Sequence, residues 1–166
     1  ANGIAPVTAI PTTTATLLLY NSADAGGTSL VIDRIGFWLG SGTPTAGATL
    51  LGAVSTAQIV TAPTAHGTGY GVQSQSGSGL SQSRALWTTA ATLPSMSNRA
   101  PAWMQIQSTF QLAAANVGQG DWYSEMWGSL VVPPKYGLGL AILSGTGTTP
   151  LYGVSATWAE LQISLE

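Results

Sequence analysis

The sequence predicts an all-β fold, a sandwich or a barrel, in a single domain of residues 1–166. Short segments rich in leucine, β-branched and aromatic residues recur between clusters of Gly, Pro, Ser and Thr, a spacing typical of sandwiches and barrels. No segment shows the repeated i, i+3, i+4 apolar spacing of an amphipathic helix. A chain of 166 residues without cysteine is long enough to bury a core without disulfide bonds.

The chain begins with an expected extended arm and continues as a series of short strands. Residues 1–15 contain two prolines and a Thr run, which disfavour helix, and we expect this arm to pack on a neighbouring subunit. The predicted strands are Thr16–Tyr20, Leu30–Leu39, Thr49–Val54, Ala102–Leu112, Tyr123–Val132, Tyr136–Leu143 and Tyr152–Leu165, with weaker candidates at Gly69–Gln73 and Leu86–Thr89. Between them, Pro63–Ser83 is predicted to be a long Gly/Ser/Gln-rich surface loop.

Two predicted strands carry apolar residues on both parities. In Leu30–Leu39 the odd positions place Val31, Ile35, Phe37 and Leu39 on one face, and the even positions place Leu30, Ile32 and Trp38 on the other. This pattern predicts a strand with both faces at least partly buried. In the last strand the apolar parity changes after Trp158, which predicts either a β-bulge near Ala159–Glu160 or burial of both faces.

The charge content is low for a protein surface. Four basic and six acidic residues make up 6% of the chain, for a net charge of −2. Because a free domain normally keeps charged residues on its surface, we expect much of this surface to be hidden in an assembly. Four scattered cations are too few to bind a nucleic-acid backbone, and no apolar run approaches the ~20 residues of a membrane span.

The residues that catalysis or metal binding would need are sparse, so we expect no enzyme, no catalytic residue, no metal site and no cofactor. The only histidine, His66, lies in the loop-like run PTAHGTGYG, and no Gly-x-Ser-x-Gly elbow follows a strand in the right context. Asp24 in NSADAGG is the best single calcium ligand, but no Asp/Asn repeat accompanies it. A turn between two strands is the simpler prediction for Asn21–Gly27.

One segment, GDWYSEMWG, combines aromatic rings with carboxylates. It contains Asp121, Trp122, Tyr123, Glu125 and Trp127. Aromatic residues are enriched in interface cores, so a core or subunit contact is the favoured interpretation. A glycan contact is the alternative, because a sugar can stack on aromatic faces while its hydroxyls meet the acids. The two carboxylates could also belong to a glycosidase, which is the least favoured interpretation. Trp38 and Trp158 are candidate subunit-interface residues, for which burial in the core is an equal alternative.

Two stretches combine turn residues with strand edges: LLLYNSADAGGTSLVIDRIGF, residues 17–37, and VVPPKYGLGLAILSGTGTTPLYGVSATWAEL, residues 131–161. They resemble the tumour-necrosis-factor/C1q-like jelly-roll domains found in structural proteins of tailed bacteriophages. The first contains a strand, an Asn-led turn and an apolar second strand. The second contains Pro-Pro before a Gly/Leu strand, a Gly/Thr-rich turn and a closing strand. The resemblance implies an antiparallel two-sheet jelly-roll sandwich, commonly a homotrimer, that serves on virions as a decoration, spike or fibre component.

The predicted function is therefore that of a virion structural protein. We expect a capsid decoration or spike component that forms a homotrimer and binds the major capsid protein or other virion proteins. One alternative is a carbohydrate-binding or adhesion module that contacts a host-surface glycan. Another is an extracellular filament subunit that donates its N-terminal arm as a strand to a neighbour.

Overall fold

The protein folds into two antiparallel β-sheets. The computed structural model describes residues 3–12, 14–44, 47–61, 63, 83–93, 103–108, 122–145 and 147–163. These residues form strands and no helix, which confirms the all-β prediction for the described part of the chain. The strands are β1 (Thr14–Asn21), β2 (Ser29–Pro44), β3 (Ala48–Val54), β4 (Ala85–Thr92), β5 (Met104–Ser108), β6 (Trp122–Val132), β7 (Gly137–Ser144) and β8 (Gly147–Leu161).

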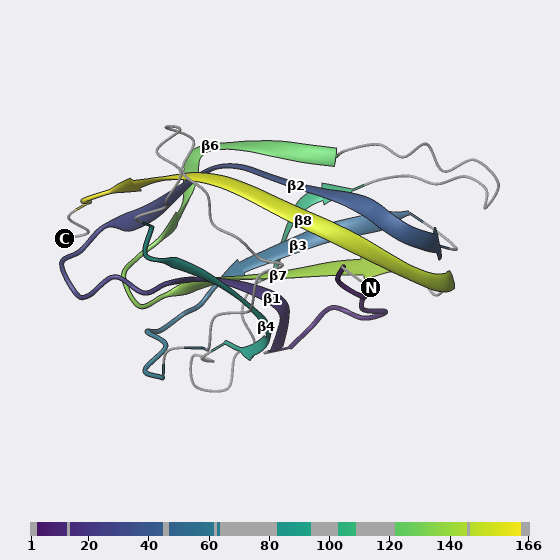
Figure 1. Ribbon diagram of the computed structural model, residues 1–166, viewed down its shortest axis with the longest axis horizontal. Helices are drawn as coiled ribbons and strands as arrows, with labels where there is room; N and C mark the ends of the chain where they lie inside the picture. Colours follow the sequence, from purple (N-terminus) through teal and green to yellow (C-terminus); the bar gives the residue numbers. More distant parts are fainter. Residues whose placement is uncertain are drawn as a thin grey trace.

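The sheets form two layers. The five-stranded sheet has the order β4-β1-β7-β3-β5, and the three-stranded sheet has the order β6-β2-β8. In Figure 1, β6, β2 and β8 run across the upper part of the molecule, with β3, β7, β1 and β4 beneath them. The predicted two-sheet antiparallel architecture is therefore present.

Within the described residues, each predicted strand corresponds to a strand in the structure, although the boundaries differ. Each of the seven predicted segments overlaps one strand, and the weaker candidate Leu86–Thr89 lies inside β4. The candidate Gly69–Gln73 falls outside the described residues, as do both ends of Ala102–Leu112 and the last residues of Tyr152–Leu165.

The main core lies between the two sheets. A second, smaller core covers the opposite face of the five-stranded sheet. Leu17 and Leu19 of β1 belong to the main core, whereas Leu18 and Tyr20 belong to the second. The second core also contains Ala15, Ala53 and Leu93, with Ile59, Leu86 and Trp103 packed against it. Strand β1 is therefore buried on both faces, which explains its continuous apolar run.

Strand β2 contains a bulge that realigns its two faces. Ile32 pairs with Trp158 and Arg34 pairs with Thr157, so Asp33 is an extra residue in β2. Both Asp33 and Arg34 are exposed, while Leu30, Ile32, Ile35 and Phe37 are all buried in the main core. The bulge gathers apolar residues of opposite parity onto one fully buried face. The other face is covered only in part: Val31 is half-buried, and Trp38 is 40% exposed.

Neither alternative predicted for Ala159–Glu160 is present, because β8 stays regular there and its outer face is exposed at Ala159 and Leu161. Val31 pairs with Ala159 and Leu30 pairs with Glu160 without interruption. Glu160 continues the inward parity of Trp158, and Leu161 points outward with 49% of its surface exposed. The irregularity lies in the neighbouring strands β2 and β6 instead.

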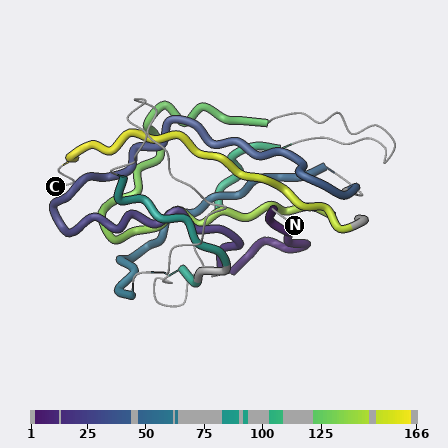
Figure 2. The backbone as a smooth tube through the Cα atoms, viewed as in Figure 1, coloured from purple at the N-terminus to yellow at the C-terminus, as the bar shows by residue number. Residues whose placement is uncertain are grey.

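The N-terminal arm folds back onto its own sandwich. Ile4 is buried and exchanges two backbone hydrogen bonds with Tyr152 of β8, at 2.7 and 2.9 Å. Val7 donates to Ile142 and accepts from Ser144, both in β7. Figure 2 shows this arm, in purple, beside the two strands. The arm connects the two sheets, because at Ile4 and Val7 it bonds to strands of its own chain.

Candidate functional site

Strand alternation divides the predicted aromatic and carboxylate cluster between two faces of β6. Trp122 turns inward and packs against Phe37, with ring centroids 5.4 Å apart. Tyr123, Glu125 and Trp127 turn outward and are exposed. Asp121 lies outside the described residues. The outer face of the three-stranded sheet therefore holds three of the five candidate glycan contacts.

The two predicted interface tryptophans also lie on opposite sides of this sheet. Trp38 is on the outer face and is 40% exposed. Trp158 faces the main core, where its ring meets Trp87 of the other sheet edge-on at 6.5 Å. Its indole Nε1 donates to Glu160, which also accepts from Ser83 Oγ. Trp158 thus has the core-packing role that the sequence left open.

A groove of about 460 Å³ opens on the outer face of the three-stranded sheet. We call it the outer-face groove, and we define it by six residues that present backbone or side chain to it. They are Arg34, Gly36, Trp38, Tyr123, Ser155 and Thr157. All three strands of the sheet contribute to it, and it combines aromatic and polar groups on one surface.

The pairing register brings these residues together in rows across the sheet. Arg34 of β2 lies between Glu125 of β6 and Thr157 of β8. In the next row, Gly36 lies between Tyr123 and Ser155. Residues of β6, β2 and β8 that are far apart in the chain thereby share one surface.

Gly36 forms the floor of the groove. A Cβ atom placed on Gly36 would lie 3.0 Å from the Trp122 carbonyl oxygen and 3.2 Å from Tyr123 Cβ. It would also lie 3.5 Å from Ser155 Oγ. A side chain here would crowd the neighbouring strand and fill the hollow, so glycine keeps the groove open.

Arg34 and Tyr123 form a stacked pair at one end of the groove. The guanidinium carbon of Arg34 lies 5.1 Å from the centroid of the Tyr123 ring, within the range of a cation–π contact. Among the described residues, no carboxylate lies within ion-pair distance of Arg34. Its N–H donors are therefore held near the groove without a described acidic partner.

Beyond the groove, β6 forms a wide bulge that displays Trp127. Ile32 pairs with Leu130 and Arg34 with Glu125, so Met126–Ser129 loop out of the ladder. Trp127 and Gly128 both have positive φ, 49° and 72°. Trp127 is 81% exposed. A bulky residue in the left-handed region is strained, and such strain often accompanies a functional position.

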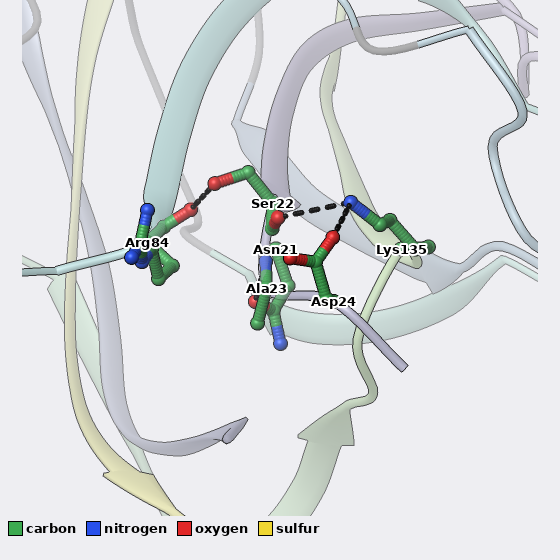
Figure 3. Close-up of polar contacts among 6 residues, drawn as sticks. All are labelled: Asn21, Ser22, Ala23, Asp24, Arg84 and Lys135. Atoms are coloured by element: carbon green, nitrogen blue, oxygen red, sulfur yellow. Dashed lines mark hydrogen bonds and ion pairs between the residues drawn. The ribbon is translucent and has the colours of Figure 1, made fainter. Parts of the chain in front are cut away.

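The segment Asn21–Gly27 forms the predicted turn, and polar contacts fix it (Figure 3). The buried Asn21 amide donates to the carbonyls of Thr28 and Val132 and accepts from the Ala23 N–H. The Lys135 ammonium, 2.9 Å from Asp24 Oδ1, lowers the pKa of that carboxyl below its ordinary value of 3.8. Asp24, the best single calcium candidate, is thus engaged by a lysine.

Other classes of site find little support in the described part of the chain. No group of three or more His, Asp or Glu side chains there is placed to hold a metal ion. No helix there is long and apolar enough to cross a membrane. His66, the single candidate base for a triad, lies outside the described residues.

Four groove residues were not identified from the sequence. Arg34, Gly36, Ser155 and Thr157 carry no local motif, and each would be ordinary in an exposed strand. Only the register of β6, β2 and β8 brings them beside Trp38 and Tyr123. A partial signal exists in the spacing: Gly36 stands two residues from Trp38 and therefore shares its face in a strand.

Comparison of the chain with known protein families, with curated proteins and with solved structures gives no match in any of the three. The resemblance to phage jelly-roll proteins therefore stays a prediction.

Proposed function

We propose that this chain is a virion structural protein, a capsid decoration or spike component that forms a homotrimer and binds the capsid surface. The observation that carries this proposal is the difference between the outer faces of the two sheets. The second core covers part of the five-stranded sheet, whereas the outer face of the three-stranded sheet displays large exposed side chains. Apolar surface of this kind favours association.

The part of this face nearest the bulge is the best candidate for a subunit contact. We call it the bulge patch, and it consists of Val31, Trp127, Val131, Ala159 and Leu161. Val31 pairs with both Val131 and Ala159, and Leu161 follows on the same face of β8. None of the five is charged, so burying this patch requires no ion to be desolvated.

The connectivity of the strands supports the jelly-roll part of the proposal. The chain passes from one sheet to the other between β1 and β2, β2 and β3, β5 and β6, β6 and β7, and β7 and β8. Repeated crossing between two antiparallel sheets of eight strands is typical of jelly rolls. A closed ring of such subunits covers the same patch on each copy without forming an open filament.

Light scattering coupled to size-exclusion chromatography tests the trimer. We expect a wild-type mass about three times the 16.9 kDa of one chain. The double variant Trp127→Ser, Leu161→Ser should shift toward the mass of one chain. Val60→Ser is the control, because Val60 is 97% exposed but lies outside the patch. A wild-type monomer over a wide concentration range would contradict the trimer.

Attachment to a particle needs a separate experiment. Genes for terminase, portal and capsid proteins beside the gene for this chain would identify the particle, and the purified chain should co-sediment with its capsids. Capsids that pellet without the chain would contradict the decoration role.

Adhesion to a host-surface glycan is a second candidate function, favoured by the outer-face groove. The filament alternative is less favoured, since the backbone groups of Ile4 and Val7, in the arm that would be donated, bond within the chain.

A further inference from the structure

We propose that the outer-face groove binds a single pyranose ring of a glycan. This site does not depend on the proposed trimer, because the bulge patch and the groove share no residue. The sequence placed a candidate glycan contact in Asp121–Trp127, whereas the structure favours a different set of residues drawn from three strands.

The shape of the groove suits a small ring. Its volume of about 460 Å³ lies within the roughly 300–1,000 Å³ of small-molecule sites. Glycine at position 36 provides the depth, because any side chain there would occupy the space between Tyr123 and Ser155. The central strand β2 is hydrogen-bonded to both β6 and β8, so little ordering is required on binding.

The aromatic residues suit the faces of a pyranose. Trp38 and Tyr123 are 40% and 54% exposed, and both line the groove. One face of a pyranose ring presents C–H groups of slight positive character, which pack on the electron-rich face of an aromatic ring. Trp38 is held in place for this contact because its indole lies over Gly153, its cross-strand partner.

The polar residues suit the edge of the ring. The hydroxyls of Ser155 and Thr157, which line the groove, each provide a donor and an acceptor. Arg34 adds several N–H donors, held by stacking on Tyr123. A ligand with apolar faces and hydroxyls around its edge therefore matches both the aromatic and the polar residues that line the groove.

Arg34 also predicts which pyranoses bind best. A guanidinium group can form two parallel hydrogen bonds with a carboxylate, so a uronic acid should bind more tightly than the corresponding neutral sugar. Glu125 pairs with Arg34 across the strands, and its negative charge repels the carboxylate of a uronic acid. Glu125 therefore reduces the preference for the uronic acid. We expect a preference of roughly threefold, because the site is open to solvent.

Ligand-observed NMR with the full chain tests the proposal. The probes are methyl β-glucoside and methyl β-glucuronide, and sorbitol is the control because it has the hydroxyls of a hexose but no ring. We expect both glycosides to bind with millimolar affinity, sorbitol not to bind, and the glucuronide to bind more tightly. Soluble monovalent probes keep the result independent of oligomeric state.

Substitutions locate the site. Trp38→Ala should weaken binding of both glycosides by about tenfold, while Trp38→Phe retains most of it because a ring remains. Thr157→Val should weaken binding without altering the fold, and Arg34→Gln should remove the preference for the glucuronide. Met104→Ala is the control, since Met104 is 43% exposed and lies in the other sheet. Thermal unfolding of each variant shows whether it is folded.

Several outcomes would overturn the assignment. The site is not a pyranose site if neither glycoside binds, if sorbitol binds as well as they do, or if folded Trp38→Ala and Thr157→Val variants bind like the wild type. If no glycoside binds and Trp38→Ala instead dissociates an oligomer, the groove is a subunit contact. An unchanged glucuronide preference in Arg34→Gln would overturn the role of Arg34.

Discussion

The indole of Trp38 occupies the space in which a side chain at Gly153 would have to stand. A Cβ atom on Gly153 would lie 2.1 Å from Cζ2 and 2.2 Å from Cε2 of the indole. The two residues pair directly between β2 and β8, so the ring covers the backbone of its partner strand. This arrangement sets the position of one wall of the outer-face groove.

Gly153→Ala should therefore displace Trp38. We expect the free energy of unfolding to fall by about 1–2 kcal/mol, because the indole must leave its place over β8. Tryptophan fluorescence should shift to longer wavelength as the ring becomes more exposed. Ser155→Ala, on the same face of β8, is the control and should change stability by no more than about 0.5 kcal/mol. Equal stability of the two variants would show that Trp38 does not depend on Gly153.

Trp127 holds a backbone conformation that costs stability. Because φ is 49° at this residue, Asn, which tolerates the left-handed region, should be more stable there than Ser. Comparing Trp127→Asn with Trp127→Ser isolates the backbone effect, since both variants lack the indole. We expect Asn to be favoured by about 0.5–1 kcal/mol in urea unfolding. Equal midpoints would mean that the bulge relaxes when the ring is removed.

The bulge in β2 predicts different results for two single-residue deletions. Deleting Asp33 removes the extra residue and leaves Ile32, Ile35 and Phe37 facing the core, so this variant should still unfold cooperatively. Deleting Gly36 reverses the faces beyond that point and should abolish cooperative unfolding. Circular dichroism during thermal unfolding distinguishes them. A well-folded Gly36 deletion would contradict the register described for β2.

The ion pair between Asp24 and Lys135 predicts a small dependence of stability on pH. The pKa of Asp24 is lower in the folded protein than its ordinary value of 3.8, mainly because Lys135 donates a hydrogen bond to it. The pair therefore stabilises the fold above that ordinary pKa, and its contribution is lost as the pH falls through the lower, folded pKa.

Lys135→Asn tests this relation, because Asn tolerates the positive φ of 67° at position 135. The Asp24 pKa, followed by NMR titration, should rise toward its ordinary value in the variant. The stability difference between wild type and variant should also narrow at acid pH. An unchanged Asp24 pKa would exclude Lys135 as the cause.

The sequence was sufficient for the strands and for the Asn21–Gly27 turn, because period-2 patterns and Asn/Gly clusters act locally. It was insufficient for the faces of β2, because one extra residue at Asp33 changes parity and IDRIG contains no signal for a bulge. The groove could not be predicted from the sequence for a different reason. Tyr123, Gly36 and Ser155 become neighbours only through the pairing of three distant segments.

The pairing of β2 with β8 has a consequence for folding during translation. Ser29 pairs with Leu161 and Pro44 with Gly147, so β2 must wait until most of the chain has been translated before its partner exists. Such distant pairing is slow, and β2 leaves the exit tunnel with unpaired edges in the meantime. Translation speed and chaperone supply should therefore govern the yield of soluble protein more strongly than its final stability does.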